Sequence, residues 1–148
     1  MTPTTIVRFP DWEERLALYL DTRADMPFRW GHHDCALFAA GAVKAMSGVD
    51  PAEVFRDKYD TSAGAALALR EHGAGTLLRT CVEWFGASKH ISQAKRGDLV
   101  MRNRTTLGVC VGQWSWFVGQ DDFRAGLISE PTAICSKAFT IPFAAVVE

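Results

Sequence analysis

The stretch Trp30-Gly31-His32-His33-Asp34-Cys35-Ala36-Leu37-Phe38 joins a loop rich in aromatic, glycine and histidine residues to an apolar helix. Asp34 is a residue type that caps helix N-termini, and Cys35 follows it in the first turn. Unpaired N–H groups and the positive end of the helix dipole lower the pKa of a cysteine placed there. Free cysteine is also among the most buried residue types. The stretch therefore predicts either an activated nucleophile or a packed thiol, with Trp30, Gly31 and Asp34 forming its environment.

Apolar side chains recur at three- and four-residue spacing after Cys35, which predicts a helix that runs to Ser47. The residues of this stripe are Cys35, Phe38, Ala39, Ala42 and Met46. Gly48 is placed to end the helix in the left-handed conformation. The thiol is therefore expected to share a helix face with the core.

The chain has 148 residues, a formal net charge of -1 and a pI near 6.4. This length suits a single domain over residues 1–148, with residues 1–8 expected as a loose N-terminal arm. The absence of basic excess argues against nucleic acid as a partner. No apolar run approaches the roughly 20 residues that span a bilayer, so we expect a soluble protein made in the cytoplasm, with no membrane-spanning segment.

Helical patterns fill the first half of the chain and strand patterns fill the second. The helical segments expected are 10–25, 35–47, 50–59, 62–72 and 75–85, and the strands expected are 98–102, 107–112, 114–119, 127–128 and 138–147. The first helix is expected to pack on the Cys35 helix. Helices followed by strands, without βαβ alternation, predict an α+β fold in which the Cys35 helix packs on a small antiparallel meander.

The four cysteines, Cys35, Cys81, Cys110 and Cys135, are far apart and form no CxxC pair. This spacing matches no zinc motif, and a disulfide framework is not expected in a reducing compartment. No cofactor or metal is predicted. Convergence of all four thiols on a metal is left open by the sequence.

Several short motifs, in their order and spacing, resemble a known family. The Trp-Gly loop, Asp34-Cys35, Gly97-Asp98-Leu99-Val100 and Gly108-Val109-Cys110-Val111-Gly112 are similar to the NlpC-like cell-wall cysteine peptidases, whose fold is papain-like. A narrower set resembles small NlpC-related proteins encoded among tail genes of long-tailed phages and prophages. Its motifs are Pro27-Phe28-Arg29-Trp30-Gly31, Asp34-Cys35, Gly48-Val49-Asp50-Pro51, Arg96-Gly97-Asp98 and Leu107-Gly108-Val109.

The peptidase resemblance implies Cys35 as nucleophile and a histidine base on the second strand of the sheet. At the position of that base the sequence has Thr106, whose hydroxyl does no acid–base work near neutral pH. His33, and beside it His32, is the best substitute by proximity to Cys35. The third polar group of such a site falls near residues 114–122, where Gln113 and Gln120 are the side-chain amides.

Two further patterns have open interpretations. Trp114, Trp116 and Phe117 form either an exposed aromatic contact surface or core packing. The acidic pair Asp121-Asp122 is too small a ligand set for calcium.

Three functions remain open. The first is a phage tail-tip protein of the virion, with a degenerate NlpC-like site and other tail proteins as partners. The second is an active cysteine peptidase or amidase that cuts peptidoglycan during genome entry. The third is a four-cysteine metal module. The missing base favours the first, because loss of one member of a nucleophile–base unit removes most of its catalysis.

Overall fold

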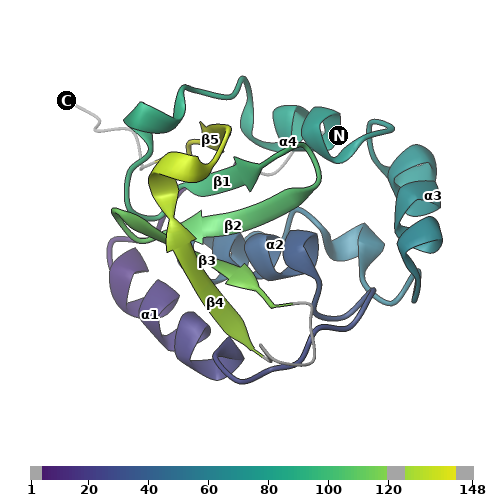
Figure 1. The fold of residues 1–148 in the computed structure, drawn as a ribbon, viewed down its shortest axis with the longest axis horizontal. Helices are drawn as coiled ribbons and strands as arrows, with labels where there is room; N and C mark the ends of the chain where they lie inside the picture. Colours follow the sequence, from purple (N-terminus) through teal and green to yellow (C-terminus); the bar gives the residue numbers. More distant parts are fainter. Residues whose placement is uncertain (1–4, 120–125, 143–148) are drawn as a thin grey trace.

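The computed structural model describes residues 5–119 and 126–142, in which helices precede strands as predicted (Figure 1). The helices are α1 (Trp12–Arg23), α2 (Cys35–Ser47), α3 (Ser62–His72) and α4 (Leu77–Phe85), with 3-10 turns η1 (Glu53–Phe55), η2 (Ile91–Gln93) and η3 (Thr132–Ile134). The strands are β1 (Leu99–Arg102), β2 (Thr106–Cys110), β3 (Trp114–Val118), β4 (Leu127–Pro131) and β5 (Lys137–Phe139). The predicted α+β class is confirmed.

Helix α2 lies at the centre of the molecule, because most of its side chains are apolar and buried. Asp34 caps it as predicted: its Oδ1 accepts a hydrogen bond of 2.9 Å from the Leu37 amide. Gly48 ends it in the left-handed conformation, with φ of 80°. Helix α1 packs against α2, and the Tyr19 hydroxyl donates to the Phe38 carbonyl over 2.8 Å. One face of α2 therefore packs on α1 and another on the sheet.

The sheet has the strand order β4-β3-β2-β1-β5, and all neighbours are antiparallel. Strands β1 to β4 form the predicted meander, whereas β5 returns to pair with β1. Of the expected strand 138–147, the structure forms only β5, which ends at Phe139; residues 140–142 are not in a strand, and residues 143–147 lie outside the described part. Strand β2 directs Leu107 and Val109 into the core shared with α2, and Cys110 into a second cluster on the other face. The sheet is thus covered on both faces.

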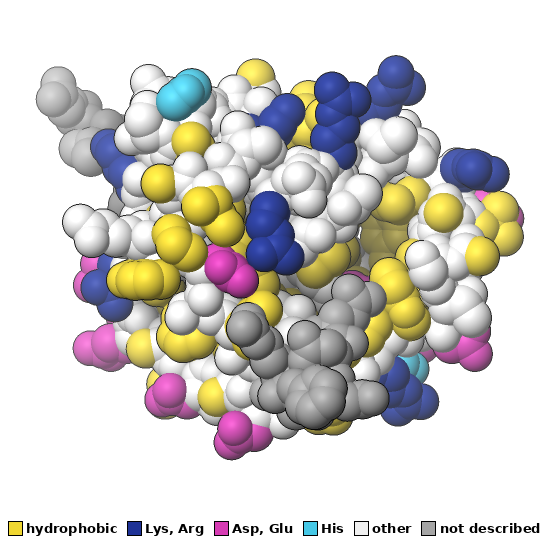
Figure 2. Space-filling model, viewed as in Figure 1, with side chains coloured by type: hydrophobic (Ala, Val, Ile, Leu, Met, Phe, Trp, Pro, Cys, Tyr) yellow, Lys and Arg dark blue, Asp and Glu magenta, His cyan; other side chains and the backbone are white. Residues whose placement is uncertain are grey.

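Helix α3 lies at the right-hand edge of the view, across the molecule from α1, and α4 lies near the β1–β2 turn (Figure 1). The space-filling view shows a hollow with apolar walls next to α3 (Figure 2). In the ranges described, no helix has both the length and the apolar character needed to cross a membrane.

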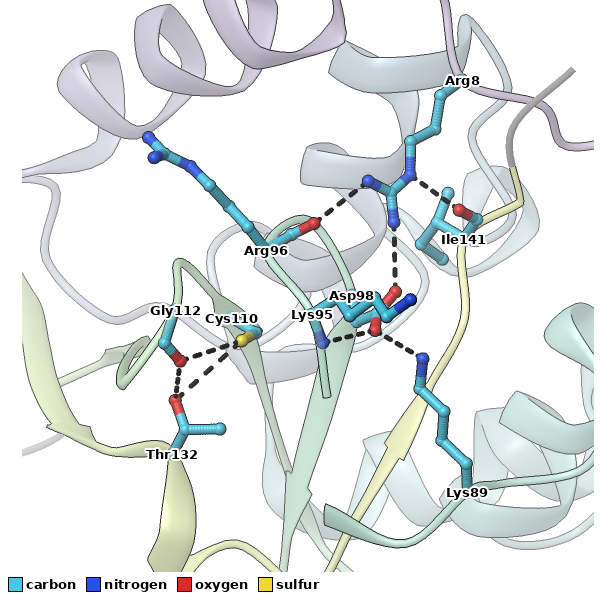
Figure 3. Close-up of polar contacts among 9 residues, drawn as sticks. All are labelled: Arg8, Lys89, Lys95, Arg96, Asp98, Cys110, Gly112, Thr132 and Ile141. Atoms are coloured by element: carbon cyan, nitrogen blue, oxygen red, sulfur yellow. Dashed lines mark hydrogen bonds and ion pairs between the residues drawn. The ribbon is translucent and has the colours of Figure 1, made fainter. Parts of the chain in front are cut away.

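The N-terminal segment is fastened at Arg8, which corrects the expectation of a loose arm through residue 8. The Arg8 Nη2 atom lies 3.1 Å from Asp98 Oδ1, and its Nε donates to the Ile141 carbonyl over 2.7 Å (Figure 3). Lys89 Nζ lies 2.6 Å from Asp98 Oδ2. Local sequence carries no sign of this anchor, because the ion pair joins residues 90 positions apart. Residues 1–4 lie outside the described part.

Candidate functional site

The loop before α2 is held by backbone contacts. Arg29 and His33 form a two-residue bridge, with N–H to carbonyl distances of 3.0 and 2.8 Å. Gly31 has φ of 80°, and a Cβ there would overlap the Tyr59 carbonyl. The loop therefore turns tightly against the segment that follows η1 and sets the entry to α2.

Asp34 binds three hydrogen-bond donors and is buried. Besides the Leu37 amide, its carboxylate accepts from the Gly31 amide at 3.1 Å and from the Tyr59 hydroxyl at 2.5 Å. Burial, together with this hydrogen bond to Asp34, raises the pKa of Tyr59 far above its ordinary value. The carboxylate is thus engaged in holding the loop, α2 and Tyr59 together.

Cys35 is half-buried in the first turn of α2, and its Sγ donates to the Thr105 carbonyl over 3.5 Å. Burial raises the pKa of the thiol to about 11. The Leu107 backbone amide opposes this effect, while the Asp34 carboxylate adds to it. Desolvation therefore outweighs the helix N-terminus, and the thiol is the stable form at neutral pH.

Thr106, where the resemblance to NlpC-like peptidases implies a base, lies in the chain between two residues whose backbone contacts the Cys35 thiol. The sulfur contacts the backbone on both sides of it, through the Thr105 carbonyl and the Leu107 amide. Thr106 is the first residue of β2 and is half-buried. Thr105 lines the cavity beside Cys35, and within the described residues no hydrogen bond joins the Thr106 hydroxyl to the Cys35 sulfur.

The side chains of His32 and His33, in the loop before α2, lie in different environments. His33 is 3% exposed and lies edge-on to Phe38, with ring centroids 5.9 Å apart. Its Nε2 is buried without a hydrogen-bond partner in the described ranges, and burial lowers its pKa. His32 is exposed, and its Nδ1 lies 2.8 Å from Asp57 Oδ1. Within the described residues, no hydrogen bond joins either imidazole to Cys35.

The two remaining histidines have partners other than Cys35. The His72 ring meets Phe55 edge-on, and His90 Nδ1 lies 2.7 Å from the Ser92 hydroxyl. Gln113 is exposed, and its carbonyl accepts from the Thr132 amide. Gln120, like the acidic pair that follows it, lies outside the described residues.

Cys35 lies on the wall of a cavity of about 590 Å³. The walls come from the loop before α2, the N-terminus of α2, η1, α3, α4 and the β1–β2 turn, and most of the side chains are apolar. The residues around this cavity include Trp30, Cys35, Leu37, Phe55, Tyr59, Leu69, Leu77, Leu78, Trp84, Arg79, Arg104 and Thr105. Such a cavity is large enough for a small ligand or a pair of side chains.

The four cysteines do not meet. Cys35 lines the cavity, Cys81 lies in the core shared by α2 and the sheet, and Cys110 and Cys135 lie in the cluster on the opposite face. Across residues 5–119 and 126–142, no group of three or more His, Cys, Asp or Glu residues could hold a metal ion. The four-cysteine metal module is therefore not formed.

Sequence reasoning missed three residues of the cavity. Tyr59, Arg79 and Arg104 come from separate segments, and no motif links them to Cys35. Of the aromatic residues at the third strand, Phe117 is core whereas Trp114 is 53% exposed. The core interpretation therefore holds for Phe117, while Trp114 is exposed to solvent.

The antiparallel sheet, the buried helix behind it and the cysteine at its N-terminus define a papain-like fold of the NlpC/p60 kind. Among solved structures, the chain is similar to the crystal structure of the NlpC/p60 domain of peptidoglycan hydrolase SagA, with a TM-score of 0.53 and 14% sequence identity. The match covers 86% of this chain and 97% of that chain. At this identity the likeness establishes the fold alone.

The chain belongs to the family described as "Domain of unknown function (DUF6950)", whose model matches residues 7–141. A comparison with curated proteins found no match.

Proposed function

We propose that this chain is a non-hydrolytic NlpC/p60-like module that serves as a structural protein of a phage or prophage tail tip. It is made in the host cytoplasm, enters the virion and binds neighbouring tail proteins. The tail assignment is supported by the motifs around Asp34-Cys35, Arg96-Gly97-Asp98 and Leu107-Gly108-Val109, which resemble those of small tail-encoded proteins. Fold by itself does not decide function, and one scaffold serves many roles.

The observation that carries the proposal is the environment of Cys35. A peptidase needs a thiolate and a group that takes up and returns a proton. Here the thiol donates to a backbone carbonyl, and a pKa of about 11 leaves about one thiolate in ten thousand at neutral pH. Thr106 stands at the position where the resemblance to NlpC-like peptidases implies the base. The site therefore has the shape of a nucleophile pocket without the means to activate the nucleophile.

Hydrolysis of peptidoglycan peptides is the second candidate. It is favoured by a specific observation: Cys35 is retained at the N-terminus of α2 and faces a cavity of about 590 Å³. His33 would serve as base in that case. Its lowered pKa keeps the imidazole neutral, which suits a base, but its ring packs on Phe38.

The test is made on a phage that encodes the chain. Mass spectrometry of purified tails is expected to find the protein in wild-type particles. Cys35→Ala phage is expected to assemble normal tails and to infect as well as wild type, because the thiol does no chemistry. Absence of the protein from purified tails would overturn the tail assignment. Normal tails that fail to infect would instead support the hydrolase.

A further inference from the structure

The cavity beside Cys35 offers a ligand an apolar interior. Phe55 and Trp84 meet edge-on with centroids 5.9 Å apart, so the two rings brace each other in one wall. Leu69 and Leu78 add aliphatic surface from α3 and α4. A bulky apolar side chain bound there would displace water from the apolar walls on several sides.

The polar groups of the wall are largely engaged within the protein. Asp34 is the acidic residue of the lining, and its oxygens already accept from three donors. The Tyr59 hydroxyl donates to Asp34, and Thr76 Oγ1 accepts from the Arg79 amide over 3.1 Å. The interior therefore has little capacity left for a polar ligand.

Two cationic side chains stand at the cavity and come from different elements. Arg79 lies in the first turn of α4, and Arg104 lies in the turn between β1 and β2; both are exposed. In contrast to Arg15 and Arg56, which pair with carboxylates, neither guanidinium makes an ion pair or hydrogen bond within residues 5–119 and 126–142. Lys and Arg side chains are visible along the upper side of the hollow (Figure 2). An apolar cavity flanked by unpaired arginines is complementary to an apolar group that carries a negative charge.

We propose that this cavity binds a short segment of a partner protein that presents a bulky apolar side chain next to a carboxylate. The side chain enters between Phe55, Trp84 and Leu69, and the carboxylate lies between Arg79 and Arg104. The choice of a peptide as occupant rests on the proposed function, because a docking module has proteins for neighbours. Aromatic walls and arginines are also the residue types enriched in the energetic centres of protein interfaces.

The test uses the full chain with Cys35→Ala, so that binding is measured without thiol chemistry. The first probe is 8-anilinonaphthalene-1-sulfonate, an aromatic molecule with one anionic group. Its binding is measured by the change in its fluorescence. The competitors are matched capped tetrapeptides, acetyl-Gly-X-Glu-Gly-amide and acetyl-Gly-X-Gln-Gly-amide, where X is Leu, Phe or Trp. Laurate serves as a lipid-like competitor.

The Glu peptides are expected to displace the probe at lower concentrations than the Gln peptides. Arg79→Gln and Arg104→Gln should each reduce this preference by about two- to fivefold, because each removes one exposed ion pair. Arg70→Gln, an exposed change on α3 outside the cavity lining, is the matched control and should leave the preference intact.

Equal displacement by Glu and Gln peptides would overturn the proposal, as would displacement by laurate alone. If Arg70→Gln reduced the preference for Glu peptides as much as Arg79→Gln does, the carboxylate would not lie between Arg79 and Arg104. Failure of the proposed function would be recognised separately, by peptide hydrolysis that depends on Cys35 in the wild-type chain. That result would remove the docking role, while the peptide binding measured with Cys35→Ala would still hold.

Discussion

At the scale of single residues, the chemistry depends on what surrounds the Cys35 sulfur. Its acceptor is the Thr105 carbonyl at 3.5 Å, and burial raises the pKa of the thiol to about 11. The helix N-terminus acts in the opposite direction and is outweighed by desolvation. The sequence predicted the Asp34 cap at the start of the Cys35 helix correctly, because a helix cap is a local feature. The degree of burial depends on packing between distant segments, so sequence left the state of the thiol open.

Thr106→His is expected to activate the thiol, because Thr106 lies between the two backbone groups that touch the sulfur. An imidazole there would accept the proton and stabilise the thiolate, raising the alkylation rate of Cys35 near neutral pH by about tenfold or more. Thr106→Gln is the matched control, since it adds a polar side chain without a base. An unchanged rate in Thr106→His would mean that this position is not within reach of the sulfur.

His33 predicts how stability depends on pH. Burial lowers its pKa below the ordinary 6.5, so in the window below 6.5 the unfolded chain binds more protons than the folded one. The stability that the neutral His33 side chain contributes is fully present above pH 6.5. This stability is lost as the pH falls toward the lowered pKa of the folded state. Denaturant unfolding across this window should show wild type losing more stability than His33→Phe, which does not titrate. Parallel pH profiles for the two proteins would contradict a neutral, buried imidazole.

At the scale of elements, local sequence signals predict the helices, whereas they predict the sheet only in part. Asp34 and Gly48 fix the ends of α2, and both signals are readable in sequence. The pairing of β5 with β1 is not readable, because it joins strands separated by the whole meander. The walls formed by η1, α3 and α4 create the cavity, and their convergence is likewise a tertiary property.

Gly41→Ala is expected to destabilise the packing of α1 on α2. Alanine in place of glycine inside a helix normally adds roughly 0.5–1 kcal/mol of stability. Here the new Cβ would overlap the Tyr19 hydroxyl and disturb its bond to Phe38, so we expect a net loss of about 1–3 kcal/mol. Urea denaturation measures this loss in the free energy of unfolding. Lys44→Ala, an exposed substitution on the same helix, is the control. A more stable Gly41→Ala protein would show that Tyr19 moves aside freely.

At the scale of the whole molecule, a buried ion network joins segments from both ends of the chain. Asp98 binds Arg8 and Lys89, while Arg8 reaches the Ile141 carbonyl (Figure 3). The Gly97-Asp98 motif that supports the family resemblance is therefore structural in this protein. Its partners lie far away in sequence, which explains why the motif could be recognised while its role could not.

Asp98→Asn is expected to lower the free energy of unfolding by about 3–5 kcal/mol, because it leaves two cations without their buried counter-ion. Asp11→Asn, which breaks the exposed pair with Arg15, is the matched control and should have little effect. Chemical denaturation of both variants makes the comparison. Equal, small losses would show that the network does not hold the ends of the chain.

The most direct test of a non-hydrolytic site is the pH dependence of Cys35 alkylation in the unmodified protein, with the labelled peptide identified by mass. A thiol pKa of about 11 predicts slow reaction at neutral pH and a half-maximal rate far into the alkaline range. The rate should be unaffected by His33→Phe. A half-maximal rate below about 8.5, lost in His33→Phe, would contradict the account and identify a working thiolate–imidazole pair.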